Sequence, residues 1–477
     1  MSQVAGLLSR RGEDVTRKLL EILGNTGVCH DAYGIATPSG AEHNPHRPGF
    51  TSLTACTALG HRLIKVHPTD GPQPMSDGGK ATAFAGRLWD TREPATPTVT
   101  KILRKSPEEG LQELLTEHVG AWTAVIADEE NIWCARDAIG SVPLYHGRSE
   151  EFIGISTDTK TILSLGMAPQ RVKPGHIVQL GGDEEKEVEV ATLEEPPQVS
   201  MSLDDATDEL DRQIERAVSR VSRGLNSPTL AFSGGIDSTI IAYYLKRSGV
   251  RPKLTCIGST DSPDPLAAES AADALGLGVR TRTITEAELE ENICAILRSV
   301  EEADPMKAGA AAPLYFVALD AAERSSRVVF SGNGSDELLG GYAKYVQEYQ
   351  DHGDKVRDTM FRDVAQSYGV NLERDWKICS DLGLELRLPF IDPDLTRFAL
   401  GLPLRYKLPS EGREPRKMIL RNLAKRLGLP GNVVEKPKKA AQYSSGTGKM
   451  IERLAKKRGR TVAGYLSERL NEAMGVK

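Results

Sequence analysis

The spacing of hydrophobic and polar positions changes near residue 200. Upstream of that point, short apolar runs are separated by Asp, Gly and Pro turns, which is typical of an antiparallel, strand-rich domain. The runs that predict its strands are 123–127, 132–135, 152–155 and 176–180. One helix is predicted before them, capped by Asp14 and ended by Gly24.

Downstream of residue 203, segments with helical periodicity alternate with short apolar runs. The predicted helices are 203–221, 267–277, 286–300 and 314–324, and the predicted strands are 253–257, 279–284 and 328–330, with a further strand just before residue 233. This alternation indicates a parallel sheet with helices on both faces. From about residue 344 to the end, the pattern is mainly helical.

The acidic, proline-containing segment 181–197 is the best candidate for a linker between the two patterns. A chain of 477 residues is long for one hydrophobic core, so two domains are expected on length alone. The boundaries that follow are 1–195 and 203–477.

A glycine loop, Ser-Gly-Gly-Ile-Asp-Ser, follows the strand before residue 233 and precedes a helix that we expect to begin at Ser238. Its two glycines, Gly234 and Gly235, let the backbone approach a ligand closely, and the start of the helix offers unpaired N–H groups to phosphate oxygens. A carboxylate beside a phosphate site, here Asp237, is explained by a Mg²⁺ ion shared with the phosphates. An ordinary strand–turn–helix junction is the alternative interpretation.

A second junction of the same kind, at residues 331–342, carries another acid, Asp336. Ligands of parallel sheets bind beyond the carboxyl ends of the strands, so the loops after residues 232, 257 and 330 are expected to converge there. Two aspartates on two adjacent loops then predict one Mg²⁺ site, with phosphate oxygens as further ligands. Simple matching of acidic side chains to a helix dipole is the alternative.

Composition disfavours several classes of function. The formal net charge is −6, so the chain has no overall positive field to gather nucleic acid. We find no apolar run long enough to cross a bilayer, and no apolar segment of the kind found in signal peptides follows Arg10 and Arg11. The six cysteines form no CxxC pair and fit reduced thiols. We therefore expect a cytoplasmic protein that binds neither nucleic acid nor membrane.

Together, the two glycine loops resemble the ATP-pyrophosphatase domain of the glutamine-hydrolysing asparagine synthetase family. Further segments of this half carry the resemblance: 371–375 and 383–392, similar to the family's N-L-x-R-D-D … G-x-E-x-R-x-P-F-L-D block; 417–421, similar to its K-x-L-L-R helix start; and 437–443, closest to the asparagine synthetase domain-containing branch. The N-terminal half resembles the family's class II glutaminase domain through the collinear segments 60–63, 73–75, 135–140, 143–145 and 174–175.

The resemblance implies a two-domain protein of the α/β plus α+β class. An Ntn-hydrolase-like antiparallel αββα domain would precede a parallel-sheet ATP-pyrophosphatase domain of the adenine nucleotide α-hydrolase type. It also implies a carbon–nitrogen ligase that uses ATP and Mg²⁺ to convert a carboxylic acid, aspartate or a related acid, into an acyl-adenylate with release of pyrophosphate. Ammonia or another amine would then attack the adenylate. The sequence leaves the oligomeric state open, a homodimer included.

The same resemblance gives roles to particular residues. Those that would cradle the pyrophosphate are Ser233, Gly234, Gly235 and Ser238. Those that would hold Mg²⁺ are Asp237 and Asp336, and those that would contact the adenosine are Ile257, Ser331 and Gly332. A lysine near the C-terminus would neutralise the charge that grows on the phosphates, and its position matches Lys438 or Lys439.

Departures from the family pattern are concentrated in the glutaminase half. Ser2 stands where the family has its cysteine nucleophile, and Ala85-Gly86-Arg87 stands where it has Asn-Gly-Glu for the oxyanion hole and for glutamine binding. Arg62, which matches the family's carboxylate-binding arginine, is kept. Removing one oxyanion donor typically costs about a hundredfold or more in rate. We therefore expect an inactive glutaminase and a free amine, ammonia above all, as the nitrogen donor.

Two departures lie in the synthetase half. Asn333 replaces a glutamate that the family uses near the acyl-adenylate to handle the proton of ammonia, and Gly309 replaces an arginine. An amide cannot act as a base near neutral pH. The expected function is thus adenylation of a carboxylate that need not be aspartate. The alternatives are an ATP-binding scaffold without turnover, another amide or lactam synthetase, and a tRNA-modifying ATP pyrophosphatase.

Overall fold

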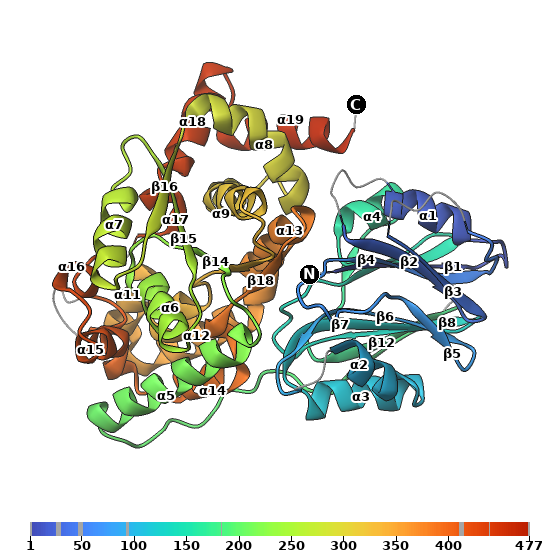
Figure 1. Cartoon of the computed structure of the whole chain (residues 1–477), viewed down its shortest axis with the longest axis horizontal. Coiled ribbons are helices and arrows are strands. Elements are labelled where there is room, and N and C mark those ends of the chain that lie inside the picture. Colours follow the sequence, from blue (N-terminus) through green and yellow to red (C-terminus); the bar gives the residue numbers. More distant parts are fainter. Residues whose placement is uncertain are drawn as a thin grey trace. The chain divides into compact units, whose positions relative to one another are not determined.

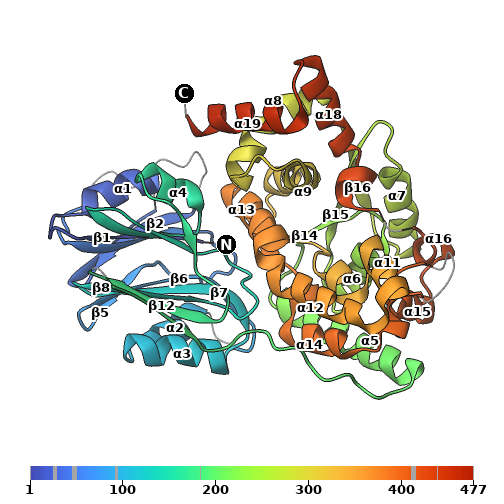
Figure 2. The ribbon, with the colours of Figure 1, turned by 180° about the vertical axis from the view of Figure 1, so that it is seen from behind.

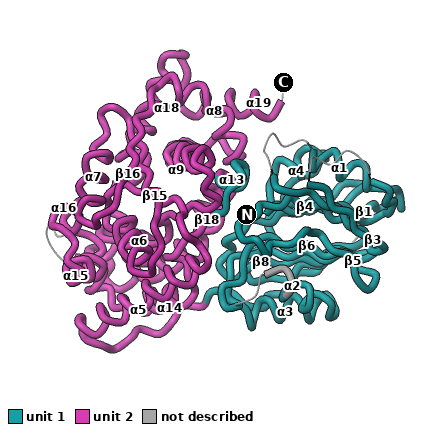
Figure 3. The backbone as a smooth tube through the Cα atoms, in the orientation of Figure 1, with its two compact units in different colours: residues 1–193, 379–385 teal, residues 194–378, 386–477 magenta. Residues whose placement is uncertain are grey.

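A computed structural model describes residues 2–24, 30–45, 51–91, 95–182, 184–409, 415–437 and 439–475. The chain divides into two compact units (Figure 3). The first unit is formed by residues 1–193 with 379–385, and the second by residues 194–378 with 386–477.

The first unit is built on two antiparallel sheets. In sheet order, the strands of the larger one are β11 (Gln170–Arg171), β9 (Tyr145–Arg148), β10 (Phe152–Ser156), β1 (Gln3–Ser9), β4 (Thr57–Leu63), β2 (Ala32–Thr37) and β3 (Gly40–Asn44). Those of the smaller one are β13 (Glu184–Glu189), β12 (His176–Gly181), β8 (Asn131–Arg136), β7 (Gly120–Ala127), β6 (Lys80–Leu88) and β5 (Met75–Asp77).

Helices cover the outer face of each sheet, which makes four layers (Figure 1). The helices on the larger sheet are α1 (Thr16–Gly24) and α4 (Thr159–Ser164), and those on the smaller sheet are α2 (Ala95–Leu103) and α3 (Pro107–Glu117). The sheets are therefore covered on both faces. This explains why the predicted strands read as continuous apolar runs rather than as alternating patterns.

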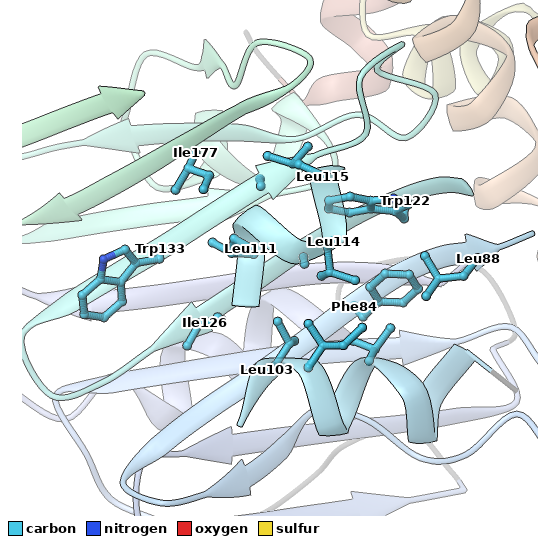
Figure 4. Packing of buried hydrophobic residues seen from close by; sticks show 14 residues of the cluster. Phe84, Leu88, Leu103, Leu111, Leu114, Leu115, Trp122, Ile126, Trp133 and Ile177 are labelled. Atoms are coloured by element: carbon cyan, nitrogen blue, oxygen red, sulfur yellow. The ribbon is translucent and has the colours of Figure 1, made fainter. Parts of the chain in front are cut away.

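The outer core of the smaller sheet is an aromatic and aliphatic cluster (Figure 4). Trp122 of β7 is 1% exposed and stacks on Phe84 of β6, with ring centroids 6.2 Å apart. Leu111 and Leu114 of α3 are fully buried in the same cluster. The amphipathic face of α3 thus closes this side of the sandwich.

The second unit contains a five-stranded sheet with the order β16-β15-β14-β17-β18. Its strands are β16 (Val279–Ile284), β15 (Lys253–Ser259), β14 (Thr229–Ala231), β17 (Val328–Phe330) and β18 (Glu385–Arg387). β14 runs parallel to both β15 and β17. After β14 the chain adds β15 and β16 on one side of it, and then crosses back to add β17 on the other side. The direction in which strands are added therefore reverses between β14 and β17. Such a switch point is where open α/β sheets bind ligands.

Helices pack on both faces of this sheet (Figures 1 and 2), as the alternating pattern predicted. They are α6 (Ile236–Arg247) and α7 (Asp264–Ala274) on one face, α9 (Pro305–Glu323) on the other, α5 (Leu203–Ser222) against α6, and α8 (Glu286–Val300) against α9. The two-domain α/β plus α+β fold class is confirmed.

The rest of the second unit is helical. The α-helices are α10 (Ser335–Leu339), α11 (Ala343–His352), α12 (Val356–Ser367), α13 (Glu373–Asp381), α14 (Pro393–Gly401), α15 (Met418–Arg426), α16 (Gly431–Val434), α17 (Ala441–Ser444), α18 (Thr447–Lys457) and α19 (Val462–Met474). Short turns of other helical types span Gly353–Lys355, Tyr368–Leu372, Pro389–Ile391 and Leu404–Tyr406. Among the described residues, no helix is long and apolar enough to cross a membrane, and the five described cysteines are free thiols.

Several predicted boundaries were wrong. The segment 181–197 is not simply a linker, because Glu184–Glu189 pairs with β12 as an exposed edge strand whose charges had suggested a loop. Helix α9 begins at Pro305, nine residues before the predicted start, because Asp304 caps it and Pro313 is accommodated inside it. Helix α6 begins at Ile236 rather than at Ser238. Helix α7 begins at Asp264.

Replacing Trp122 by alanine should lower the free energy of unfolding of the first unit by about 3–5 kcal/mol, because a large buried side chain is lost without refilling. Urea unfolding followed by circular dichroism measures this. The matched control is Leu163→Ala in α4, whose side chain is 48% exposed. Equal shifts in the two variants would contradict the proposed packing.

Candidate active site

A cavity of about 230 Å³ lies at the carboxyl ends of β14, β15 and β17. The sequence-predicted residues that line it are Ser233, Asp237, Ser238, Ile257, Ser331, Gly332, Asp336 and Lys439. Gly234 and Gly235 shape the first loop without being part of the lining. The structure therefore brings together side chains that are spread over more than 200 residues of sequence.

The first loop is held by glycine geometry. Gly234 has φ +63°, and a Cβ there would overlap the backbone carbonyl of Ala267. Gly235 is the N-cap of α6, and no side chain caps that helix end. The first N–H groups of α6 are therefore not capped by a side chain, which suits the binding of phosphate oxygens.

The second loop touches the first. A Cβ at Gly332 would lie 3.0 Å from the Cβ of Asp237. Gly334, with φ +94°, precedes α10, and Asp336 lies in the first turn of that helix. The two glycine loops thus meet at the switch point between β14 and β17.

The ammonium group of Lys417 joins the two loops. Its Nζ lies 2.6 Å from Asp237 Oδ1, 2.7 Å from Asp336 Oδ1 and 2.6 Å from Ser335 Oγ. The Lys417 side chain is 1% exposed, and its backbone has φ +62° just before α15. The sequence gave no catalytic or binding role to Lys417, although it begins the 417–421 segment similar to K-x-L-L-R.

Asp237 and Asp336 fit a Mg²⁺ site. Their carboxylate oxygens converge on a single cation, and Mg²⁺ in nucleotide sites is usually held by one or two carboxylates together with phosphate oxygens. Larger groups of His, Cys, Asp and Glu that could hold a metal on their own are absent from the described residues. A metal here would accordingly depend on the nucleotide for its other ligands.

Basic residues border the phosphate loop. Lys439 lines the cavity, whereas Lys438 lies outside the described residues. Lys436, which the sequence analysis missed, donates to the backbone carbonyl of Ser233 at 3.0 Å and lies 3.4 Å from Asp264 Oδ1. Lys436 and Lys439 therefore place positive charge beside the loop that would hold phosphate.

A polar network lies on another part of the cavity wall. The amide of Asn333 donates to Asp375 Oδ2, and Arg374 Nε donates to Asp375 Oδ1 at 2.7 Å. Arg374 also donates to Asn371 Oδ1 at 3.1 Å. Burial raises the pKa of Asp375, although Arg374 opposes that shift.

Position 309, where the resemblance places an arginine, has little room for a side chain. Gly309 lies inside α9, and a Cβ there would lie 3.0 Å from the Cβ of Gln442. A long cationic side chain at this position would require the segment around Gln442 to move.

In the first unit, the position of the family's glutamine-binding glutamate carries an ion-paired arginine. Arg87 donates to both carboxylate oxygens of Asp70, at 2.5 and 2.6 Å, and its Nε donates to Glu385 at 2.9 Å. All three side chains are at most 10% exposed. The buried guanidinium of Arg87 thus stands where the resemblance places the carboxylate that binds glutamine.

The guanidinium of Arg62 is also engaged in hydrogen bonds within the protein. Its guanidinium donates to Gln3 Oε1 at 2.5 Å and to the backbone carbonyl of Ile22 at 3.1 Å, and it is 2% exposed. The Ser2 hydroxyl accepts from the backbone N–H of Ile64 at 3.3 Å. The side-chain amide of Gln3 thus takes up hydrogen-bonding capacity that a substrate carboxylate would need.

Comparison with known proteins identifies relatives of both halves. The asparagine synthase family model matches residues 209–353 and 347–474. A putative glutamine-hydrolysing asparagine synthetase of Methanocaldococcus jannaschii is 30% identical, over 97% of this chain and 90% of that protein. Asparagine synthetase 2 of Arabidopsis thaliana is 26% identical, over 85% of this chain and 74% of that protein.

Among solved structures, glutamine PRPP amidotransferase from B. subtilis is similar with a TM-score of 0.35 and 12% identity, covering 60% of this chain and 92% of that chain. NMN synthetase from Francisella tularensis is similar with a TM-score of 0.30 and 15% identity, covering 58% and 94% of the two chains.

Replacing Lys417 by methionine should lower the free energy of unfolding by about 3–5 kcal/mol, because two neighbouring carboxylates lose their shared cation. Millimolar Mg²⁺ should restore part of the lost stability, since it can occupy the same place. Thermal unfolding with and without Mg²⁺ measures both effects. Lys425→Met, at an exposed position of the same helix, is the control. A Lys417 variant that Mg²⁺ stabilises no more than the unmodified protein would contradict the assignment.

Proposed function

The chain belongs to the asparagine synthase family, and from that premise we propose that it is an AMP-forming ligase that adenylates a carboxylic acid and transfers the acyl group to ammonia. As a member of this family it is a carbon–nitrogen ligase that uses ATP. The acid, the nitrogen donor and the Mg²⁺ requirement are parts of the proposal.

One observation carries it: two glycine loops meet at the switch point, and each brings one aspartate to the same cation. A loop with unpaired N–H groups and two carboxylates for a shared Mg²⁺ suits a pyrophosphate leaving group. The arrangement supports cleavage between the α- and β-phosphates.

The residues then have distinct tasks. Ser233, Ser238 and the N-terminus of α6 would bind the pyrophosphate, and Lys439 would offset the charge that grows on it. Asp237 and Asp336 would hold Mg²⁺, whose charge would polarise the phosphates. Ile257, Ser331 and Gly332 would contact the adenosine. The acid's carboxylate would attack the α-phosphate, giving an acyl-adenylate from which AMP leaves when the amine attacks.

The acid is proposed to be aspartate or a related carboxylic acid. The cavity wall differs from the family pattern at Asn333, and Gly309, buried in α9, lies next to the lining residues Ala310 and Gln442. The resemblance places both positions near the acyl group, so the two changes support a preference that departs from aspartate.

Free ammonia is proposed as the nitrogen donor. Ser2 replaces the cysteine nucleophile, and Arg87, in place of the glutamine-binding glutamate, is ion-paired with Asp70 and Glu385. The one matching glutamine-binding residue, Arg62, donates to Gln3. A site filled by its own side chains cannot bind glutamine without breaking buried ion pairs, which is costly.

Pyrophosphate–ATP exchange should occur with Mg²⁺ and a suitable carboxylic acid and should be abolished in Asp237→Asn and Asp336→Asn. Screening the exchange across aspartate and other carboxylic acids identifies the substrate. The control is Asp261→Asn, an exposed acid outside the cavity. Tight ATP binding with no exchange for any acid would instead favour an ATP-binding scaffold.

Ammonium should support amide formation and glutamine should not, because the glutaminase site lacks its cysteine nucleophile and its glutamine-binding glutamate, and Arg62 is engaged by Gln3. Restoring the cysteine alone, as Ser2→Cys, should leave glutamate release undetectable, since Arg87 and Arg62 remain engaged. Glutamate release by the unmodified protein that is lost in Ser2→Ala would refute this assignment.

A further inference from the structure

The carboxylate of Asp375 lies in the wall of the ATP cavity and has no task in the scheme above. It is 1% exposed and has two polar partners, Arg374 at one oxygen and the Asn333 amide at the other. Burial raises its pKa, so it can both hold and release a proton closer to neutral pH than an exposed aspartate. Buried carboxylates of this kind in ligand cavities are candidates for acid–base chemistry.

Asp375 lies beside the loop that carries Asp336, one of the proposed Mg²⁺ ligands. Asn333 lies on the loop that follows β17, three residues before Asp336. The Asp375 carboxylate is thus one hydrogen bond away from the loop that would hold the nucleotide's metal. In an acyl-adenylate, a single oxygen separates the acyl carbon from the α-phosphorus. A group beside this loop is therefore close to the carbon that the amine attacks.

Other acidic groups in the described lining of the cavity are engaged elsewhere. Asp237 and Asp336 share Lys417, and Asp264 faces Lys436. Burial raises the pKa of the Cys256 thiol to about 12, so it stays protonated at neutral pH.

The remaining titratable lining groups are also poor bases. The Tyr342 hydroxyl donates to Glu337 at 2.7 Å, and burial raises its pKa. Arg374 is a cation that pairs with Asp375 itself. The Asp375 carboxylate is the acid–base group best placed in the described part of the wall.

We propose that Asp375 accepts the proton that the attacking amine loses as the amide forms, an inference that rests on the function proposed above. The nitrogen lone pair forms the C–N bond at the acyl carbon, and the C–O bond to AMP breaks with its electron pair leaving on the AMP phosphate. The proton on nitrogen passes to a carboxylate oxygen of Asp375 and from there to solvent.

Asn333 then has a positioning role. Its side chain cannot take a proton, but its amide donates to Asp375 and fixes the direction of that carboxylate. Arg374 fixes the other oxygen. The base has in effect moved from position 333, where the resemblance places a glutamate, to the facing position 375.

The test separates the two half-reactions in Asp375→Asn. The rate of amide formation should fall about 10²–10⁴-fold, which is the usual contribution of a general base. Acid-dependent pyrophosphate–ATP exchange should persist. The acidic limb of the pH profile for amide formation should disappear. Hydroxylamine nitrogen is less basic than ammonia nitrogen and gives up its proton more readily after attack, so hydroxylamine should lose less rate than ammonia.

The swapped variant, Asp375→Asn with Asn333→Asp, keeps one carboxylate and one amide across the same contact. It should recover part of the rate of amide formation. Such recovery would show that the loss in Asp375→Asn is not caused by a folding defect. Exchange and amide formation that fall together in Asp375→Asn, with no recovery in the swapped variant, would show a structural role and overturn the proposal. Absence of exchange in the unmodified protein would instead overturn the proposed function.

Discussion

The second unit depends on one buried ammonium group that holds two carboxylates from separate strand ends. Left alone, Asp237 and Asp336 would repel each other across the junction of their loops, at a cost that rises as water is removed. Lys417 offsets that repulsion and keeps both side chains aimed at one point. A nucleotide arriving with Mg²⁺ would bring a second cation to the same place. Lys417 thus keeps the two carboxylates close together, as the proposed binding of a metal–pyrophosphate complex requires.

The first unit combines a well-packed core with departures from the family pattern at the positions that the resemblance assigns to glutamine binding. Its four layers are intact and its core is well packed. At those positions, Arg87 is ion-paired with Asp70 and Glu385, and Arg62 donates to Gln3 and to the backbone carbonyl of Ile22. Buried side chains that are already engaged by neighbouring groups must break those contacts before they can bind a ligand. These contacts are the structural basis for proposing free ammonia, rather than glutamine, as the nitrogen donor.

Much of this could be predicted from the sequence. Helical and strand periodicity predicted the antiparallel first half and the parallel sheet of the second half. The two glycine loops were expected to meet because the strand ends of a parallel sheet share its carboxyl edge, and they do meet there. Lys417 was missed as a binding residue because a lone lysine carries no local signal of burial. Asp375 was missed for a related reason: it faces Asn333 only after 42 residues of intervening chain have folded back. The edge strand 184–189 was missed because five of its six residues are charged, and exposure on one sheet edge permits that composition.

The central claim is that this loop pair cleaves ATP between its α- and β-phosphates. Phosphorus NMR of the products formed from ATP, Mg²⁺, ammonium and the acid substrate tests it most directly. The account predicts AMP and pyrophosphate in equal amounts, formed only when the acid is present. ADP and inorganic phosphate as the products would contradict it.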